Sequence, residues 1–158
     1  MGIPVYFKNL LRDHSNKILQ KPTIIHNVFF DLNCLLHPCC SSVESGDEQE
    51  MICKIKQSIQ DLIDFTGVTD LIYIAIDGPA PRAKMEQQKQ RRFKKSLEEK
   101  VWDTSAITPG TYFMKQLNKE LHHFITSDIV FPGTIILSDS SEPGEGEHKI
   151  LTYLKQKK

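Results

Sequence analysis

The sequence predicts an α/β fold in which a mostly parallel sheet is flanked by helices. Three short runs are apolar, rich in β-branched or aromatic residues and without polar alternation, as is typical of parallel strands covered on both faces. They are NVFFDL from Asn27, DLIYIAI from Asp70 and GTIIL from Gly133. Helical patterns separate the runs, and strands that alternate with helices indicate a parallel sheet.

Two amphipathic patterns predict the helices between these strands. After the polar loop SSVESGDEQE, one helical face carries Ile52, Ile55, Ile59, Leu62 and Ile63. Before the third strand, another face carries Phe113, Leu117, Leu121, Phe124 and Ile125. We expect this second helix to begin with Thr108 as its N-cap and Pro109 as its first helical residue.

Composition indicates one soluble globular domain. The chain has 158 residues, 39% of them hydrophobic and 25% charged, and its formal net charge is zero. Affinity for a polyanion therefore requires local clustering of positive charge. No apolar run is long enough to span a bilayer, and the first residues lack the pattern of a signal peptide. The four cysteines form no Cys-x-x-Cys pair, so we expect reduced thiols and an intracellular protein, cytoplasmic or nuclear.

Acidic residues follow all three predicted strands. Asp31, Asp77 and Asp139 stand at the ends of the strand runs, and the turn after the third run adds Glu145 and Glu147. Parallel α/β sheets place ligand sites beyond the carboxyl ends of their strands. If the strands are neighbours, Asp31, Asp77 and the Glu145/Glu147 turn share one crevice. Clustered carboxylates favour a hard cation such as Mg²⁺ or Mn²⁺, which often serves phosphate chemistry.

The stretch ILSDSSEPGEGEHKIL, from Ile136 to Leu151, has two interpretations. Two carboxylates about 4 Å apart repel by roughly 4 kcal/mol at an effective dielectric constant near 20, so we expect a cation to compensate them. Alternatively, the glutamates lie in the first turn of a helix and complement its dipole.

A basic run follows Asp77 almost at once. Between Arg82 and Lys95 there are seven positive residues and one negative residue, Glu86. On a helix, one face would carry Lys84, Gln88, Arg91, Arg92 and Lys95. Such a run is usually a solvated face. Its position beside a crevice aspartate favours phosphate recognition by arginine and lysine side chains.

These residues together resemble the Xrn-type 5′→3′ exoribonucleases. The matching segments, in the order of the family, are MGIP, FFDLNCLLH, AIDGPAPRAKMEQQKQRRF, ITPGTYFM and PGEGEHKI. The resemblance extends over nearly the whole chain. It implies a PIN-like, flap-nuclease-like core that degrades single-stranded RNA from its 5′ end with a divalent metal, releasing nucleoside 5′-monophosphates.

The resemblance also implies roles for particular residues. The acidic, catalytic metal ligands would be Asp31, Asp77, Glu145 and Glu147, and the pocket for the 5′-terminal monophosphate would be Lys84, Gln88, Arg91 and Arg92. His37 would meet the first nucleotides, by stacking on a base. Asp139 is not among the family's expected ligands, and we leave it outside the site.

The resemblance further implies that residues 1–158 form the N-terminal part of a 5′→3′ exoribonuclease domain, truncated at its C-terminal side. In the family, further catalytic aspartates follow the GEGEHKI segment, whereas LTYLKQKK follows it here. Two alternatives to an active exoribonuclease therefore stay open. One is an RNA-end binding fragment with weak or no catalysis, and the other is a related flap-type DNA nuclease.

Overall fold

The predicted α/β fold is confirmed by the computed structural model, which describes residues 5–14, 24–79 and 102–157. Its sheet has three parallel strands in the order β1-β2-β3. They are β1 (Asn27–Asp31), β2 (Leu71–Ala75) and β3 (Thr134–Ser138), one in each predicted run. Asp31 pairs with Ala75, and Ala75 pairs with Ser138, so the carboxyl ends of the strands lie in one row.

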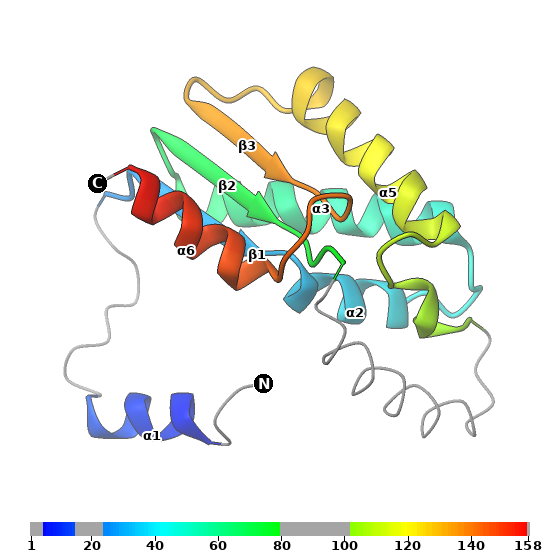
Figure 1. The fold of residues 1–158 in the computed structure, drawn as a ribbon, viewed down its shortest axis with the longest axis horizontal. Helices are drawn as coiled ribbons and strands as arrows, with labels where there is room; N and C mark the ends of the chain where they lie inside the picture. The colour runs from blue at the N-terminus through cyan, green and yellow to red at the C-terminus, as the bar shows by residue number, and fades with distance from the viewer. Residues whose placement is uncertain (1–4, 15–23, 80–101, 158) are drawn as a thin grey trace.

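Helices flank this sheet on both faces (Figure 1). The helices in the described part of the chain are α1 (Tyr6–Asp13), α2 (Asn33–Ser41), α3 (Glu48–Thr66), α5 (Tyr112–His123) and α6 (Gly146–Gln156), with short turns at η2 (Thr104–Ala106) and η3 (Phe124–Asp128). Of these, α2, α3, α5 and α6 pack around the sheet. In Figure 1, α3 lies behind the sheet, α5 lies beside β3, and α6 lies in front of β1 and β2. The chain therefore changes face after β3.

The hydrophobic core lies on the face that carries α2, α3 and α5. Alternate residues of β2 point into it, because successive side chains of a strand face opposite sides. The core includes Ile72 and Ile74 from β2, Ile55 and Ile59 from α3, and Leu117 from α5, each of them buried. The apolar periodicity seen in the sequence therefore corresponds to this face.

The opposite face of the sheet is aromatic where it meets α6. Tyr73 of β2 packs on Tyr153 of α6 with ring centroids 4.8 Å apart, and Phe29 of β1 lies 6.3 Å from the same Tyr153 ring. Offset aromatic pairs at these separations are favourable. These rings hold α6 against the middle of β1 and β2.

The N-terminus of α5 differs from the one that the sequence predicts. The helix begins at Tyr112, and the Thr111 hydroxyl accepts a hydrogen bond from the Met114 N–H at 3.3 Å. The prediction of Thr108 and Pro109 at the helix start is wrong, because Gly110 adopts a left-handed conformation with φ of 92° and interrupts the helical path. Thr108 instead accepts the Thr111 N–H at its carbonyl, in the preceding turn.

Two further expectations concern the cysteines and membrane spans. All four cysteines are free, and Cys39 and Cys40 are buried in the core. In the described ranges, no helix is both long and apolar enough to cross a membrane.

A pair of substitutions on α3 tests the assignment of the core. Ile59 is fully buried, whereas Phe65 on the same helix is 64% exposed. We expect Ile59→Ala to lower the free energy of unfolding by about 2–5 kcal/mol, because it removes packed methyl groups and leaves a cavity. Phe65→Ala should change that energy by no more than about 0.5 kcal/mol. Urea denaturation followed by circular dichroism measures both, and equal losses would contradict the assignment.

Candidate functional site

Asp31 closes β1 and begins the turn into α2. Its Oδ1 accepts hydrogen bonds from the Asn33 backbone N–H at 3.2 Å and from the Asn33 side-chain amide at 3.0 Å. A carboxylate beside the first turn of a helix is stabilised by the helix dipole. The carboxylate of Asp31 is thus fixed at the carboxyl edge of the sheet.

Asp77, two residues beyond the end of β2, contacts the first turn of α6. Its Oδ1 accepts the Gly146 backbone N–H at 2.7 Å. The first N–H groups of a helix have no partner within the helix, and side-chain oxygens commonly satisfy them. Asp77 therefore caps α6 from a different element and joins the end of β2 to the turn after β3.

Gly146 lies against both aspartates. A Cβ atom at this position would stand 2.7 Å from Asp31 Oδ1, so no larger residue fits without a shift of that carboxylate. Asp31 and Asp77, 46 positions apart in the chain, thus meet at one residue of α6.

Backbone contacts hold the neighbouring turn in place. The Gly78 N–H donates to the Gly144 carbonyl at 2.8 Å, and the Gly144 N–H donates to the Pro79 carbonyl at 3.3 Å. A Cβ at position 78 would stand only 1.6 Å from the Glu142 carbonyl oxygen. The segment after Asp77 and the acidic turn therefore pack backbone against backbone, which requires glycine at position 78.

Glu145 and Glu147 flank Gly146 in the chain. Glu145 is the N-cap residue of α6, and Glu147 is an exposed residue of the first helical turn. This placement agrees with the interpretation that they complement the helix dipole. Within the described parts of the chain, no three acidic, histidine or cysteine side chains lie close enough together to hold a metal ion. The four-carboxylate site stays a prediction.

The pair Asp31 and Asp77 nevertheless suits Mg²⁺ or Mn²⁺. Among the described residues, the hydrogen bonds to Asp31 and Asp77 are all accepted by Oδ1 atoms. No donor among these residues bonds to the Oδ2 atom of either aspartate. Mg²⁺ typically keeps several waters and binds one or two carboxylates together with substrate phosphates. Two hard oxygen donors at one sheet edge fit that requirement.

Cys34, in the first turn of α2, lies within the electrostatic field of this edge. Partial burial and the negative charges of Asp31 and Asp77 raise the pKa of its thiol. The thiol is therefore neutral near pH 7. A local negative potential of this kind attracts cations.

Asp139, which the sequence leaves outside the site, bonds toward α5. Its Oδ2 lies 2.8 Å from Nε2 of His122, and its Oδ1 accepts the N–H of Ser141 at 2.8 Å. Burial alone would raise the pKa of Asp139, but the hydrogen bonds from Ser141 and His122 outweigh it and lower that pKa. Asp139 thus stabilises the turn after β3.

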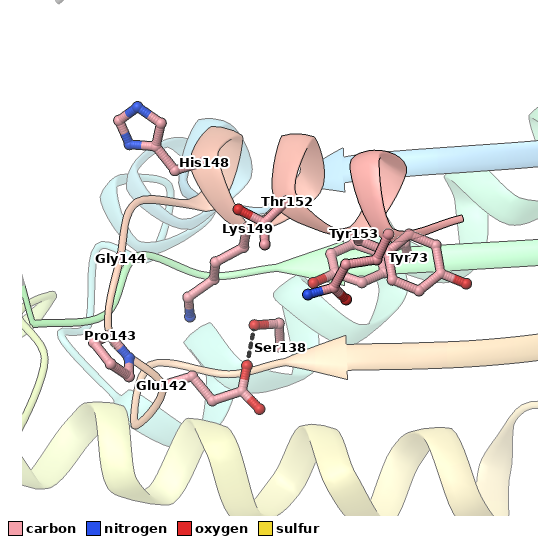
Figure 2. A pocket seen from close by; sticks show the side chains of 10 residues that line it. Tyr73, Ser138, Glu142, Pro143, Gly144, His148, Lys149, Thr152 and Tyr153 are labelled. Carbon is pink, nitrogen blue, oxygen red and sulfur yellow. Dashed lines mark hydrogen bonds between the residues drawn. The ribbon is translucent and has the colours of Figure 1, made fainter. Parts of the chain in front are cut away.

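Lys149 is the residue of this region that sequence reasoning missed. It is 8% exposed, and its Nζ donates to the carbonyls of Ile76 at 2.8 Å and Asp139 at 2.7 Å. Figure 2 shows its side chain extending from α6 toward the ends of β2 and β3, while His148 points away. One signal was available: a cation was expected to compensate the acidic turn, and Lys149 is the lysine nearest to Glu147 in the sequence.

The remaining predicted residues are less informative about the site. His37 is exposed on α2. The predicted phosphate pocket lies outside the described residues, so it stays a prediction; it comprises Lys84, Gln88, Arg91 and Arg92.

A double-mutant cycle tests the close approach of Gly146 to Asp31. In the native background, Gly146→Ala should be neutral or destabilising, because its Cβ displaces the Asp31 carboxylate. In an Asp31→Ala background the same change should raise the free energy of unfolding by a few tenths of a kcal/mol to about 1 kcal/mol, since alanine favours a helix more than glycine does. Urea denaturation in EDTA gives the four energies. An equal effect of Gly146→Ala in both backgrounds would refute the contact.

Comparisons with known proteins identify relatives of this chain. The family model described as "XRN 5'-3' exonuclease N-terminus" matches residues 1–101 and 94–158. A "5'-3' exoribonuclease 2 homolog" of Drosophila melanogaster is 31% identical, with 100% of this chain and 24% of the relative aligned. "5'-3' exoribonuclease 1" of Schizosaccharomyces pombe is 32% identical, again over 100% of this chain but 14% of the relative.

The lengths of these alignments add two facts. The chain spans no more than about a quarter of the curated relatives named above. The alignments cover 218 and 188 residues, more than the 158 of the chain, so the relatives carry additional residues inside the shared region. The family model nevertheless matches this chain from its first residue to its last. The chain therefore belongs to the family of XRN 5′-3′ exonuclease N-terminal regions.

Proposed function

We propose that this chain is the N-terminal part of a metal-dependent 5′→3′ exoribonuclease domain. Its substrate would be single-stranded RNA with a 5′-monophosphate, and its products nucleoside 5′-monophosphates. The observation that carries the proposal is the meeting of Asp31 and Asp77 at Gly146, on the carboxyl edge of a parallel sheet. The relatives at 31–32% identity are named 5'-3' exoribonucleases, which supports the reaction class.

Four carboxylates would hold the cation in this proposal: Asp31, Asp77, Glu145 and Glu147. A bound Mg²⁺ or Mn²⁺ lowers the pKa of water and neutralises charge on a phosphate. Asp31 and Asp77 are held at their Oδ1 atoms by N–H donors, so their orientations are set before any ligand arrives. Such preorganisation lowers the cost of binding.

Recognition of the RNA end is assigned to the basic run that follows Pro79. Arginine and lysine make charge-assisted hydrogen bonds to phosphate oxygens. At the 5′ end of an RNA, such bonds form only when the terminal nucleotide carries a phosphate. We assign this role to Lys84, Gln88, Arg91 and Arg92. The exposed His37 on α2 follows Asp31 by six positions and would meet the first nucleotides.

A second candidate is an RNA-end binding fragment with little catalysis of its own. It is favoured by the arrangement of the side chains, since no three acidic, histidine or cysteine side chains among the residues described gather closely enough to hold a metal ion. Two-metal phosphodiester hydrolysis needs ligands around both the attacking and the leaving oxygen. Both candidates share the basic run and the acidic edge, by which we mean Asp31, Asp77, Glu145 and Glu147 at the carboxyl ends of the strands. They differ in how fast they hydrolyse RNA.

Metal titration tests the acidic edge. We expect the chain to bind Mn²⁺ with an affinity that falls more than about tenfold in Asp77→Ala, because a direct ligand contributes at least as much as an outer-shell partner. Asp61→Ala, at an exposed position on α3, should leave the affinity unchanged. Isothermal titration calorimetry measures all three proteins. Equal Mn²⁺ affinity in the native protein and in Asp77→Ala would show that Asp77 is not a metal ligand and only caps α6.

RNA binding and turnover separate the two candidates. We expect tighter binding of a 5′-monophosphate RNA than of the same RNA with a 5′-hydroxyl at one fixed salt concentration, and loss of that preference in Arg91→Ala. Lys119→Ala, on α5, is the matched control of equal charge change. No preference in the native protein would refute end recognition.

A time course with the 5′-monophosphate RNA and Mn²⁺ then measures release of mononucleotides. We expect release to be far slower than from a full-length relative, because this chain spans at most 24% of the relatives named above. Asp77→Ala detects contaminating nuclease. Rapid release that disappears in Asp77→Ala would show that this chain alone suffices for catalysis.

A further inference from the structure

We propose that Lys149 is a positioning residue for the acidic edge. Its buried ammonium group fixes the first turn of α6 relative to the ends of β2 and β3, and so fixes Gly146 and its two glutamate neighbours relative to Asp77. For its effect on metal binding, the inference rests on the metal-dependent function proposed above. Its structural part stands on the contacts of Lys149 alone.

The two acceptors of Lys149 lie at the ends of two strands. The Ile76 carbonyl, 2.8 Å from Nζ, immediately precedes Asp77, and the Asp139 carbonyl, 2.7 Å from Nζ, immediately follows β3. Hydrogen bonds from a charged donor are roughly twice as strong as neutral ones. One side chain of α6 therefore contacts the ends of two neighbouring strands.

The backbone of Lys149 continues the connection into the acidic turn. Its N–H donates to the Glu145 carbonyl at 3.0 Å, which closes the first turn of α6. Gly146, in the same turn, donates to Asp77 Oδ1 at 2.7 Å. Hydrogen bonds and the covalent chain thus form a closed ring of contacts. It runs from Ile76 through Lys149 to Gly146 and returns through Asp77. Displacement of the ammonium group would open this ring.

The charge of Lys149 suits this location. Burial lowers the pKa of the Lys149 ammonium group. The negative charges of Glu142, Asp139 and Asp77 act in the opposite direction and offset part of this effect. An unpaired buried charge is costly, and Lys149 is stabilised by its two carbonyl partners and this surrounding negative charge. Figure 2 shows the ammonium beside the turn that carries Glu142 and Gly144.

The apolar contacts of α6 are too few to replace these bonds. Among the described residues of α6, the buried ones are Gly146 and Lys149. Leu151 and Leu154 remain 52% and 41% exposed. The contact of Tyr153 with Tyr73 holds the C-terminal half of the helix and lies one turn beyond Lys149. The N-terminal turn of α6 therefore depends on polar contacts for its position.

The experiment compares Lys149→Met and Lys149→Gln with the native protein. Methionine keeps the side-chain length and removes the donors, and glutamine keeps neutral donors if the methionine variant does not fold. The first readout is the Gly146 amide in ¹⁵N-resolved NMR without metal, because hydrogen bonding to a carboxylate shifts its proton downfield and slows its exchange with solvent. The second readout is Mn²⁺ affinity.

Two control variants separate positioning from general loss of stability. Ile55→Val lowers core stability from α3, on the opposite face of the sheet. Lys155→Met removes an exposed lysine near the end of α6. Both should preserve the Gly146 amide and the Mn²⁺ affinity.

We expect Lys149→Met to move the Gly146 amide proton upfield, to remove its exchange protection and to weaken Mn²⁺ binding by about 10–100-fold, as for outer-shell partners of metal ligands. An unchanged Gly146 amide in both Lys149 variants would overturn the proposal. So would an equal change in Ile55→Val. If the native protein binds no Mn²⁺, the proposed function fails, whereas the amide readout still decides the role of Lys149.

Discussion

The hydrogen bond from Gly146 to Asp77 determines how α6 meets the sheet, and the acidic edge depends on it. The bond places the N-terminus of α6 at the carboxyl end of β2, and the absence of a side chain at Gly146 allows the helix to approach Asp31 of β1. A helix N-terminus carries partial positive charge, so it stabilises both carboxylates. Glu145 and Glu147 are the chain neighbours of Gly146, so the position of α6 determines where their backbone lies relative to Asp31 and Asp77.

Two sources of positive charge thus act on this edge from inside the protein. The N-terminus of α6 donates to Asp77 and lies close to Asp31, and the ammonium group of Lys149 donates to the carbonyls of Ile76 and Asp139. The Gly146 N–H of the helix donates to an Oδ1 atom, and the ammonium group donates to backbone carbonyls. Neither donates to the Oδ2 atom of Asp31 or Asp77. This positive charge therefore partly compensates the two carboxylates without using their Oδ2 atoms.

Sequence reasoning succeeded where a local pattern determines the structure. The three strands and the aspartates that follow them were predictable, because apolar runs without alternation and parallel topology place residues at one edge regardless of packing details. The start of α5 was not, because Thr108 and Thr111 are both good N-caps and the left-handed Gly110 decides between them. The role of Lys149 was hidden too, since its partners are backbone carbonyls of two distant segments.

The two faces of the sheet are held by different forces, and this matters for the site. The face with α2, α3 and α5 is stabilised by a contiguous apolar core, whereas α6 is fixed by aromatic stacking and by the polar contacts of Gly146 and Lys149. Elements with few buried apolar contacts open at a lower free energy than the core does. The part of the acidic edge that α6 contributes therefore belongs to the less stable layer of the fold.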